Sequence, residues 1–479
     1  MTAATDQILT VAQMRAAEEA LIGRGATVDG LMQIAGAGAA EWVWRVAAGR
    51  AATVLCGPGN NGGDGYVIAE SLRRRGLAVT AVAPLEPSTG AAQRARAAFG
   101  GTIGTLGKGG VFVDCLFGSG LMRPLGPQLA RLVRELARHH HYRIAVDLPS
   151  GVESDSGALL DENLPWYDLT LALGAWKFAH GLMPAMATMG ERRLVAIGVQ
   201  PVERAATLLA RPRLGAPAVD AHKYTRGLVL VVGGAMAGAA VLACDAALRG
   251  GAGAVRLASA DPPASLAPDV VLKGQPLGEL LQDERTDAVL VGPGLGRDEA
   301  AKERLAAVLA ANLPAVADAD ALTLLTPQSL ERRSASLVLT PHGGELARLL
   351  TSFAVRGEGK MAQAAALAQA TRAVVVAKGP DTVIAAPDGR IVLAPSPTSW
   401  LAVAGTGDVL AGILASRLAA LHDPFAAACE AVWLHGEAAR HAGQAFLASD
   451  LARAVSRAYA AALCAKARLS FASPPRAMA

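Results

Sequence analysis

The sequence has 479 residues, more than one hydrophobic core usually supports, so we expect two domains. Hydrophobic residues make up 52% of it and charged residues 18%, which excludes a disordered chain and is typical of a compact α/β protein. The net charge of +4 arises from 45 basic and 41 acidic residues with interspersed signs, so no basic stripe indicates a nucleic-acid partner.

The cysteines and the apolar runs restrict the compartment. Five cysteines are scattered without Cys-x-x-Cys pairs or zinc spacing, so we expect small core residues of a reducing compartment. The first residues lack a cationic segment followed by an apolar stretch, and no apolar run is long enough to cross a bilayer. These patterns predict a cytoplasmic protein without a membrane partner.

Short apolar runs alternate with helical patterns along the first half. Thr10 and Gln13 predict a capping box for a helix that continues to Ile22, and Val28–Val46 fits a second helix. This alternation predicts a mostly parallel sheet with helices on both faces and ligands at the carboxyl ends of its strands. The next elements expected, strands and helices in turn, are Ala52–Cys56, Tyr66–Arg75, Ala78–Pro84, Ala91–Phe99, Val111–Asp114, Gln128–Arg138 and Arg143–Asp147, and Leu169–Leu173 is a further strand.

Polar residues follow three of these strands. The glycines of Gly57–Gly65 satisfy G-x-G-x-x-G, and with Glu86 they allow a plain dinucleotide fold, although the spacing to Glu86 is longer than that fingerprint prefers. The pair Asn60-Asn61 is the sharper feature, because its carbonyl oxygens suit a hard cation or an amide. Asp114 and Asp147 end two more strands. Each aspartate alone is more often a turn cap, but three polar strand ends in one sheet favour a site.

Two further features of this half are less specific. His139-His140-His141 has no metal-ligand spacing and fits an exposed helix end. Trp176-Lys177 follows a strand, so Lys177 is either a cation at the same sheet edge or a surface lysine.

Prolines and glycines interrupt the pattern near residues 200–220, which predicts a first domain at 1–205, a linker at 206–218 and a second domain at 219–479. A second alternating series follows, with a hairpin at Pro387-Asp388-Gly389 near its end. Its expected elements are Leu228–Val232, Ala237–Leu248, Ala254–Leu257, Ala288–Val291, Glu299–Ala311, Leu337–Leu339 and Val374–Ala377.

The second half ends its strands with Gly292–Gly296, Asp318-Ala319-Asp320, Thr340–Glu345 and Lys378-Gly379. The turn Gly405-Thr406-Gly407-Asp408 precedes an apolar helix, whose free N–H groups suit a phosphate. Asp408 is then placed to take a proton from a substrate hydroxyl, although the same tetrapeptide also fits a tight turn that begins a helix. His342 lies in a turn, which favours a ligand role. Lys378 suits a phosphate contact or a salt bridge. Together these features predict a site for a phosphorylated nucleotide.

In combination and order, these motifs resemble the family of bifunctional NAD(P)H-hydrate repair enzymes over nearly the whole chain. The resemblance also rests on Arg123-Pro124, His222-Lys223 and Ala237-Gly238-Ala239. It implies an N-terminal Rossmann-like three-layer epimerase domain and a C-terminal ribokinase-like dehydratase domain. The implied activities are interconversion of the R and S forms of hydrated NADH or NADPH, and dehydration of the S form with ADP, giving AMP and phosphate. It also implies a homo-oligomer.

The resemblance further implies a set of site residues. In the epimerase domain Asn61, Asp114 and Ser150 would hold K⁺, and Asp147 is our candidate acid and base. In the dehydratase domain Mg²⁺ would accompany ADP, and Asp408 would act as the base. The residues expected to line the epimerase site are Asn60, Asn61, Gly62, Gly63, Asp64, Gly118, Ser119, Gly120, Leu121, Met122, Arg123, Pro124 and Asp147. Those expected to face the hydrate in the dehydratase are Ala239, Gly294, Gly296, His342 and Asp408. Those expected to bind ADP are Lys378, Gly379, Pro380, Asp381, Thr382, Thr398, Ser399, Trp400, Leu401, Ala402, Val403, Ala404, Gly405, Thr406 and Gly407.

The sequence departs from the family pattern at Ser396–Val403, which lacks the usual glycine-asparagine opening, and at Ala404, where glycine is common.

The substrate suggests why a phosphate is needed: phosphorylation turns a hydroxyl, which leaves poorly, into a good leaving group expelled by the ring nitrogen. An alternative is a ribokinase-like kinase of a small alcohol, whose first domain binds only a nucleotide or a partner protein.

Overall fold

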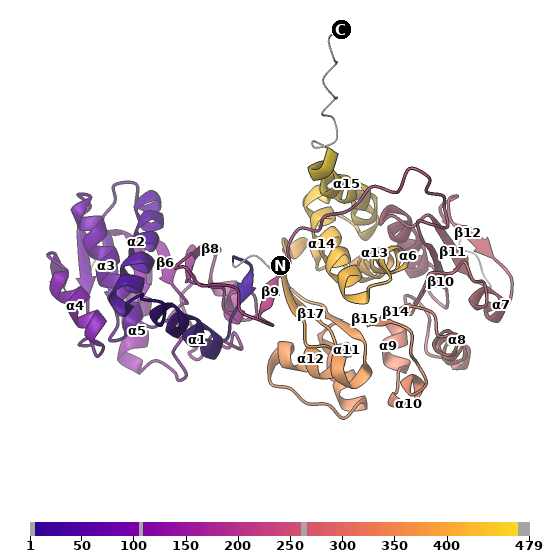
Figure 1. Cartoon of the computed structure of the whole chain (residues 1–479), viewed down its shortest axis with the longest axis horizontal. Helices are drawn as coiled ribbons and strands as arrows, with labels where there is room; N and C mark the ends of the chain where they lie inside the picture. Colours follow the sequence, from indigo (N-terminus) through magenta and orange to yellow (C-terminus); the bar gives the residue numbers. More distant parts are fainter. Residues whose placement is uncertain (1–4, 105–108, 260–265, 468–479) are drawn as a thin grey trace, which may run out of the picture. The chain divides into compact units, whose positions relative to one another are not determined.

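The computed structural model describes residues 5–104, 109–259 and 266–467. The chain divides into two compact units, Met1–Leu208 and Leu209–Ala479 (Figure 1). This division lies inside the stretch expected to be a linker, of which the first residues form strand β9 (Ala206–Leu208). None of the described helices is both long and apolar enough to cross a membrane.

The first unit is built on a parallel sheet in the order β4-β3-β2-β5-β6-β7-β8. The chain runs outward one way from β2 and the other way from β5, so the strand order reverses between them, where Leu55 is aligned with Asp114. Ligands of such sheets lie in the crevice that this reversal leaves at the carboxyl ends. The strands are β2 (Ala52–Cys56), β3 (Val79–Val82), β4 (Thr102–Gly104), β5 (Gly109–Cys115), β6 (His140–Val146), β7 (Leu169–Leu173) and β8 (Glu191–Val195).

Helices cover both faces of this sheet. The helices α1 (Val11–Ile22), α2 (Val28–Ala47), α3 (Asn60–Arg74) and α4 (Gly90–Ala98) share one apolar core, and α5 (Pro127–Arg138) closes the other face. The expected capping box of Thr10 and Gln13 is present at the start of α1. A short strand β1 (Gln7–Ile8) pairs with β9, and the turns η1 (Phe178–His180) and η2 (Ala185–Thr188) follow β7.

Two expectations for this unit are corrected. Helix α3 begins at Asn60 and not at Tyr66, so the asparagine pair forms its first turn. The histidine run is not wholly an exposed helix end: His140 begins β6, is 5% exposed, and lies within hydrogen-bond distance of Thr53 Oγ1 (2.8 Å). Strand β6 begins directly after His139, the C-cap of α5, and the polar histidine sequence did not indicate a strand there.

The second unit contains a sheet in the order β18-β17-β16-β15-β14-β13-β10-β11-β12. The strands from β12 to β16 are parallel, and β17 and β18 form the expected antiparallel hairpin. Its order reverses at β10, beside β13. The strands are β10 (Leu228–Val232), β11 (Ala254–Ala258), β12 (Val271–Lys273), β13 (Ala288–Val291), β14 (Ala315–Ala317), β15 (Leu337–Leu339), β16 (Val374–Ala377), β17 (Asp381–Ala385) and β18 (Ile391–Pro395).

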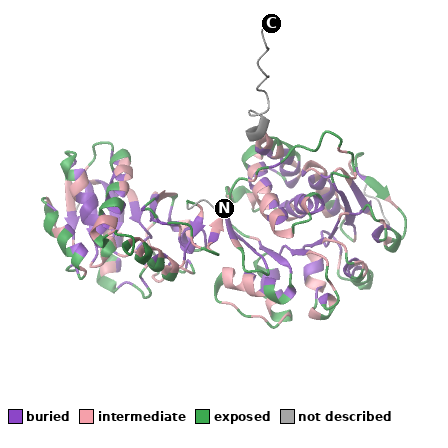
Figure 2. Cartoon of the chain, viewed as in Figure 1, coloured by how far each residue is buried: buried purple, intermediate pink, exposed green. Residues whose placement is uncertain are grey.

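Helices α6 (Ala237–Arg249), α13 (Thr406–Leu421), α14 (Pro424–Ala442) and α15 (Ala448–Ala467) lie on one face of this sheet (Figure 1). Helix α13 is buried along most of its length (Figure 2). It packs closely on α6 because a Cβ at Gly412 would lie 2.2 Å from the carbonyl oxygen of Ala243. The other helices are α7 (Leu277–Leu281), α8 (Glu299–Ala310), α9 (Asp320–Leu324), α10 (Pro327–Leu330), α11 (Gly343–Ser352) and α12 (Gly359–Thr371).

The expected fold class is therefore confirmed: both units are α/β, and a parallel sheet with helices on both sides is the centre of each.

Candidate active sites

Glycines bring the β2–α3 turn against the end of β5. A Cβ at Gly57 would lie 1.7 Å from the carbonyl oxygen of Leu116, and one at Gly62 would lie 1.9 Å from the carbonyl oxygen of Gly57. Only glycine allows backbones to approach this closely. The turn therefore places the first residues of α3 at the crevice where the strand order reverses.

Asp114 is fully buried at this crevice and joined to Ser150. Ser150 Oγ donates to Asp114 Oδ1 (2.8 Å), its N–H donates to Oδ2 (3.1 Å), and the Tyr167 hydroxyl also donates to Oδ2. Burial raises the pKa of Asp114, and these hydrogen bonds oppose that rise. The three strands β5, β6 and β7 are thereby tied together beneath the site.

Asn61, in the first turn of α3, has two unsatisfied polar atoms. Both its Oδ1 and its Nδ2 are buried without a hydrogen-bond partner among the described residues. A buried amide in this state is costly unless a ligand completes it. Gly118 lies beside it, because a Cβ there would be 3.3 Å from Asn61 Cγ and 2.8 Å from Asp147 Oδ2. The amide oxygen of Asn61 is therefore available as a ligand, whereas among the described residues no group of three or more His, Cys, Asp or Glu side chains is placed to hold a metal ion.

Asp147 follows β6 in a left-handed backbone conformation, with φ of +65°. Its Oδ1 accepts from Lys177 Nζ (2.5 Å), and its Oδ2 accepts from the N–H of Ser119 (2.9 Å). Burial acts to raise the pKa of Asp147, but the charge and hydrogen bond of Lys177, with smaller contributions from His180 and the Ser119 N–H, together lower it. The carboxylate is therefore ionised at neutral pH.

Asp64 is a third buried carboxyl group in this site, on the second turn of α3. Burial, followed by the charges of Asp147 and Glu18, raises its pKa well above the usual range. Glu18 of α1 also has a raised pKa, chiefly through burial. The pKa values of Asp64 and Asp147 are thus shifted in opposite directions, the arrangement expected of an acid and a base.

The remaining residues expected in the first site lie on α3 and on the loop after β5. Asn60 Oδ1 accepts from Thr89 Oγ1 (2.8 Å), so its side chain is held by α4 rather than free. Met122 is 73% exposed on the loop after β5, whereas Leu121 is buried in the core of α5. The structure places the others on the first turns of α3 and on the loop after β5, namely Gly62, Gly63, Ser119, Gly120, Arg123 and Pro124.

In the second unit, the turn after β13 packs under the first turn of α6. Gly294 has φ of +64°, and a Cβ there would lie 2.2 Å from the carbonyl oxygen of Met236. The N–H of Met236 donates to the carbonyl oxygen of Gly294 (2.9 Å). Ala239 lies in that first turn of α6. Asp320 fixes the far end of the turn by accepting from the N–H of Gly296 (3.0 Å).

Three charged residues meet at the neighbouring strand ends. Asp318 after β14 is 1% exposed, and its Oδ1 accepts from Lys378 Nζ (2.6 Å) and Thr340 Oγ1 (2.6 Å). Lys378 also lies against α13, because a Cβ at Gly407 would be 3.4 Å from its Nζ. Burial and the Asp318 charge raise the pKa of Asp408 to about 6, against the opposing effect of Lys378. Asp408 can therefore accept a proton near neutral pH.

The helix α13 begins at this group with Gly405, whose φ is +91°. Thr406 turns its hydroxyl back to the carbonyl oxygens of Leu401 and Val403 (both 3.0 Å). None of the described side chains caps the helix, so its first N–H groups are available to an anion. His435 of α14 bonds the carbonyl oxygen of Thr406 (3.0 Å) and is neutral, since burial lowers its pKa to about 4.

The segments expected to bind a nucleotide flank this helix end. Lys360 of α12 pairs with Asp381 (2.5 Å) and donates to the carbonyl oxygen of Lys378 (3.2 Å), and Thr382 Oγ1 bonds Gly379. The stretch that departs from the family pattern forms the turn η3 (Ser399–Leu401), with Thr398 as its cap. Trp400 is 47% exposed there. The same two segments, 378–382 and 398–404, also contain Pro380, Ala402, Val403 and Ala404.

His342 caps α11 rather than standing free. Its Nδ1 accepts from the N–H of Gly344 (3.0 Å), and its Nε2 lies 3.4 Å from Glu345 Oε1. The side chain is 58% exposed, so its outer edge is open to a ligand.

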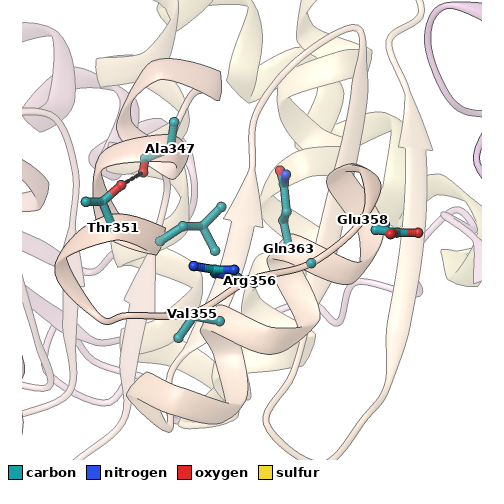
Figure 3. Close-up of a pocket in the computed structure, with 8 residues that line it drawn as sticks. Ala347, Thr351, Val355, Arg356, Glu358 and Gln363 are labelled. Carbon is teal, nitrogen blue, oxygen red and sulfur yellow. Dashed lines mark hydrogen bonds between the residues drawn. The ribbon is translucent and has the colours of Figure 1, made fainter.

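A hollow of about 620 Å³ lies elsewhere, between α11 and α12 (Figure 3). Its lining includes Leu350, Thr351, Arg356 and Gln363, and no residue expected in either site contributes.

Sequence reasoning missed His180, Lys360 and His435 and left Lys177 undecided. Of these, only Lys177 carried a signal, its position after a strand.

Comparison with known proteins follows the same division. A family profile described as NAD(P)H-hydrate dehydratase matches residues 229–460, and one described as YjeF-related protein N-terminus matches residues 28–179. The bifunctional NAD(P)H-hydrate repair enzyme of Gloeobacter violaceus is 36% identical over 91% of this chain and 94% of its own. The bifunctional NAD(P)H-hydrate repair enzyme of Mycobacterium tuberculosis is 36% identical over 78% of this chain and 79% of its own. The structure of the ADP/ATP-dependent NAD(P)H-hydrate dehydratase from Bacillus subtilis, co-crystallised with ATP/Mg²⁺, is 29% identical with a TM-score of 0.46 and covers 53% of this chain and 95% of that one.

Proposed function

The chain belongs to the family of bifunctional NAD(P)H-hydrate repair enzymes, and from that premise we propose which residues perform its two reactions. It is an epimerase joined to a dehydratase of hydrated NADH and NADPH. This family membership favours repair over the small-alcohol kinase with a non-catalytic first domain.

We propose that Asp408 is the base of the dehydratase. Its raised pKa, about 6, is the observation that supports this role, because a carboxylate of that basicity accepts a hydroxyl proton effectively at neutral pH. The hydroxyl oxygen then attacks the terminal phosphorus of the nucleotide. Phosphate departs from the carbon as the ring nitrogen lone pair forms a C=N bond, and loss of the neighbouring C–H proton restores the dihydropyridine.

The start of α13 would hold the moving phosphate. The uncapped N–H groups after Gly405 and the Lys378 ammonium supply fixed positive charge where the phosphoryl group develops negative charge. We propose ADP as donor, with AMP and phosphate as products, and Lys378–Thr382 and Thr398–Ala404 as the nucleotide segments. Mg²⁺ would accompany the nucleotide and neutralise part of the phosphate charge, whereas Asp318 Oδ1 already accepts from two donors of the chain.

In the first unit we propose that Asp147 moves protons at the hydroxyl-bearing carbon of the hydrate. It is ionised, buried and held by two hydrogen bonds, which is what a positioned base requires. We propose that Asn61, with Asp114 and Ser150, holds K⁺. The cation would supply positive charge that orders the loops after β2 and β5, and the unpartnered amide of Asn61 supports this.

The test gives the full chain a mixture of both hydrate epimers with ADP or ATP and follows recovery of NADH absorbance. Repair should be complete, with AMP formed from ADP. Asp147→Asn should repair only the S form at the normal rate, and then slow to uncatalysed interconversion. Asp408→Asn should stop dehydration while epimer exchange continues. A stable phosphorylated product would instead support the kinase. Full repair by either variant would overturn that residue's role.

A further inference from the structure

A lysine that is 2% exposed lies at the centre of the epimerase site. Lys177 Nζ donates to Asp147 Oδ1 (2.5 Å) and to the carbonyl oxygen of Leu173 (2.6 Å), the last residue of β7. Lysine is almost never buried without a partner, and the Lys177 ammonium is hydrogen-bonded to a carboxylate and a carbonyl oxygen in place of water. We propose that Lys177 is a positioning residue for epimerisation, which keeps the Asp147 carboxylate ionised and fixed toward the substrate.

A second contact fixes the backbone of the same aspartate. The N–H of Lys177 donates to His180 Nδ1 (2.9 Å), so the ring proton is on Nε2, which donates to the carbonyl oxygen of Asp147 (2.7 Å). Asp147 has φ of +65°, a conformation that non-glycine residues rarely adopt, and surrounding contacts must hold it there. One segment after β7 therefore holds both the carboxylate and the backbone of Asp147.

Stability alone does not explain this ion pair. Removing two charges from water is costly, and well-packed apolar residues in place of a buried pair are often as stable or more so. The pair also leaves Asp147 Oδ2 on the other side, toward Ser119 and Gly118, where a substrate would lie. Lys177 holds Oδ1 and one backbone N–H holds Oδ2, so these contacts fix the orientation of the Asp147 carboxylate.

The other titratable groups around Asp147 do not supply the positive charge that Lys177 supplies. Glu18 of α1 and Asp64 of α3 both interact with Asp147 as like charges when ionised, and His180 is neutral because burial, followed by the charge of Lys177, lowers its pKa to about 4. Lys177 is thus the cation that offsets burial at this position. Without it, burial would raise the pKa of Asp147, and less of the carboxyl group would be ionised to act as a base.

This inference rests on the proposed role of Asp147, and the experiment separates the two. The epimerase rate of the full chain is measured from pH 6 to 9 for Lys177→Met, Asp147→Asn and the double variant, with the dehydratase rate on the S hydrate as internal control. At pH 7 we expect Lys177→Met to lower kcat at least about ten-fold with KM nearly unchanged. Its activity should recover as the pH rises, by a shift of about one unit or more in the midpoint. The double variant should match Asp147→Asn.

Each other result overturns one claim. Full epimerase activity in Asp147→Asn removes the role of that aspartate. Loss in Asp147→Asn with an unchanged pH profile in Lys177→Met removes the positioning role alone, as does an equal loss at every pH. If Lys177→Met does not fold, Lys177→Gln, which keeps an N–H donor without the charge, decides between the same outcomes.

Discussion

Replacing Asp408 with asparagine should both stop dehydration and stabilise the second unit. The folded protein raises the pKa of Asp408 from 3.8 to about 6, chiefly through burial, so the fold opposes the charge that the reaction needs. A rise of about two units at about 1.4 kcal/mol each gives a ceiling of about 3 kcal/mol. Part of the side chain meets solvent, and we reduce the expected gain to about 1–2 kcal/mol.

The gain has a definite pH dependence. Because the folded pKa exceeds the unfolded one, the contribution of Asp408 to stability is present below pH 3.8 and is lost as the pH rises through about 6. Asp408→Asn has no such loss. Its advantage over the native chain should therefore be near zero at pH 4 and full at pH 7, where it corresponds to a few degrees in the unfolding midpoint.

Thermal unfolding of nucleotide-free protein at both pH values measures this difference, and Asp220→Asn, at an exposed aspartate, is the control. An equal or lower midpoint for Asp408→Asn at pH 7 would refute the reasoning, as would a gain that is the same at pH 4. Retained dehydratase activity would refute the catalytic role independently.

Three further variants test other contacts. Gly294→Ala should lower dehydratase kcat/KM at least ten-fold or unfold the second unit, because the new Cβ would lie 2.2 Å from the Met236 carbonyl oxygen; an unchanged kcat/KM would contradict this close approach. Lys378→Met should move the pH midpoint of any remaining dehydratase activity above about 6, since Lys378 lowers the pKa of Asp408; a pH–rate profile checks the sign. Asn61→Ala should remove any dependence of epimerisation on K⁺ over Li⁺, measured by titrating each chloride salt, whereas an unaltered K⁺ response would exclude Asn61 as a ligand.

The central strands could be predicted from the sequence because they are continuous apolar runs. Leu228–Val232 and Ala288–Val291 were both expected and both form, since each is buried on two faces. Strand β8 was not expected: Glu191–Val195 begins with three charged residues because it is an edge strand with partly exposed side chains. Its pairing is a tertiary effect that local pattern does not contain.

The candidate sites divide in the same way. Glycines and carboxylates directly after strands, such as Asp147 and Gly294, could be found because chain order places them at one sheet edge. His435 could not, because it contacts Thr406 from a position 29 residues farther along the chain, and only packing determines that contact. Lys177 follows a strand as well, but the sequence did not distinguish its contact with Asp147 from a surface position. The site roles, the K⁺ site, the domain limits and the homo-oligomer stay predictions.

The packing of α6 has a consequence for variation within this protein. Its first turn supports the Gly294 turn through Met236, and its middle accepts Gly412 of α13 against Ala243. The preceding residue, Leu242, lies beside Gly405, where a Cβ would be 2.9 Å from its Cδ1. One helix thus sets the separation between the turn that faces the hydrate and the turn that faces the phosphate. A larger residue on this helix would shift both turns at once, so substitutions there should be tolerated only in compensating pairs.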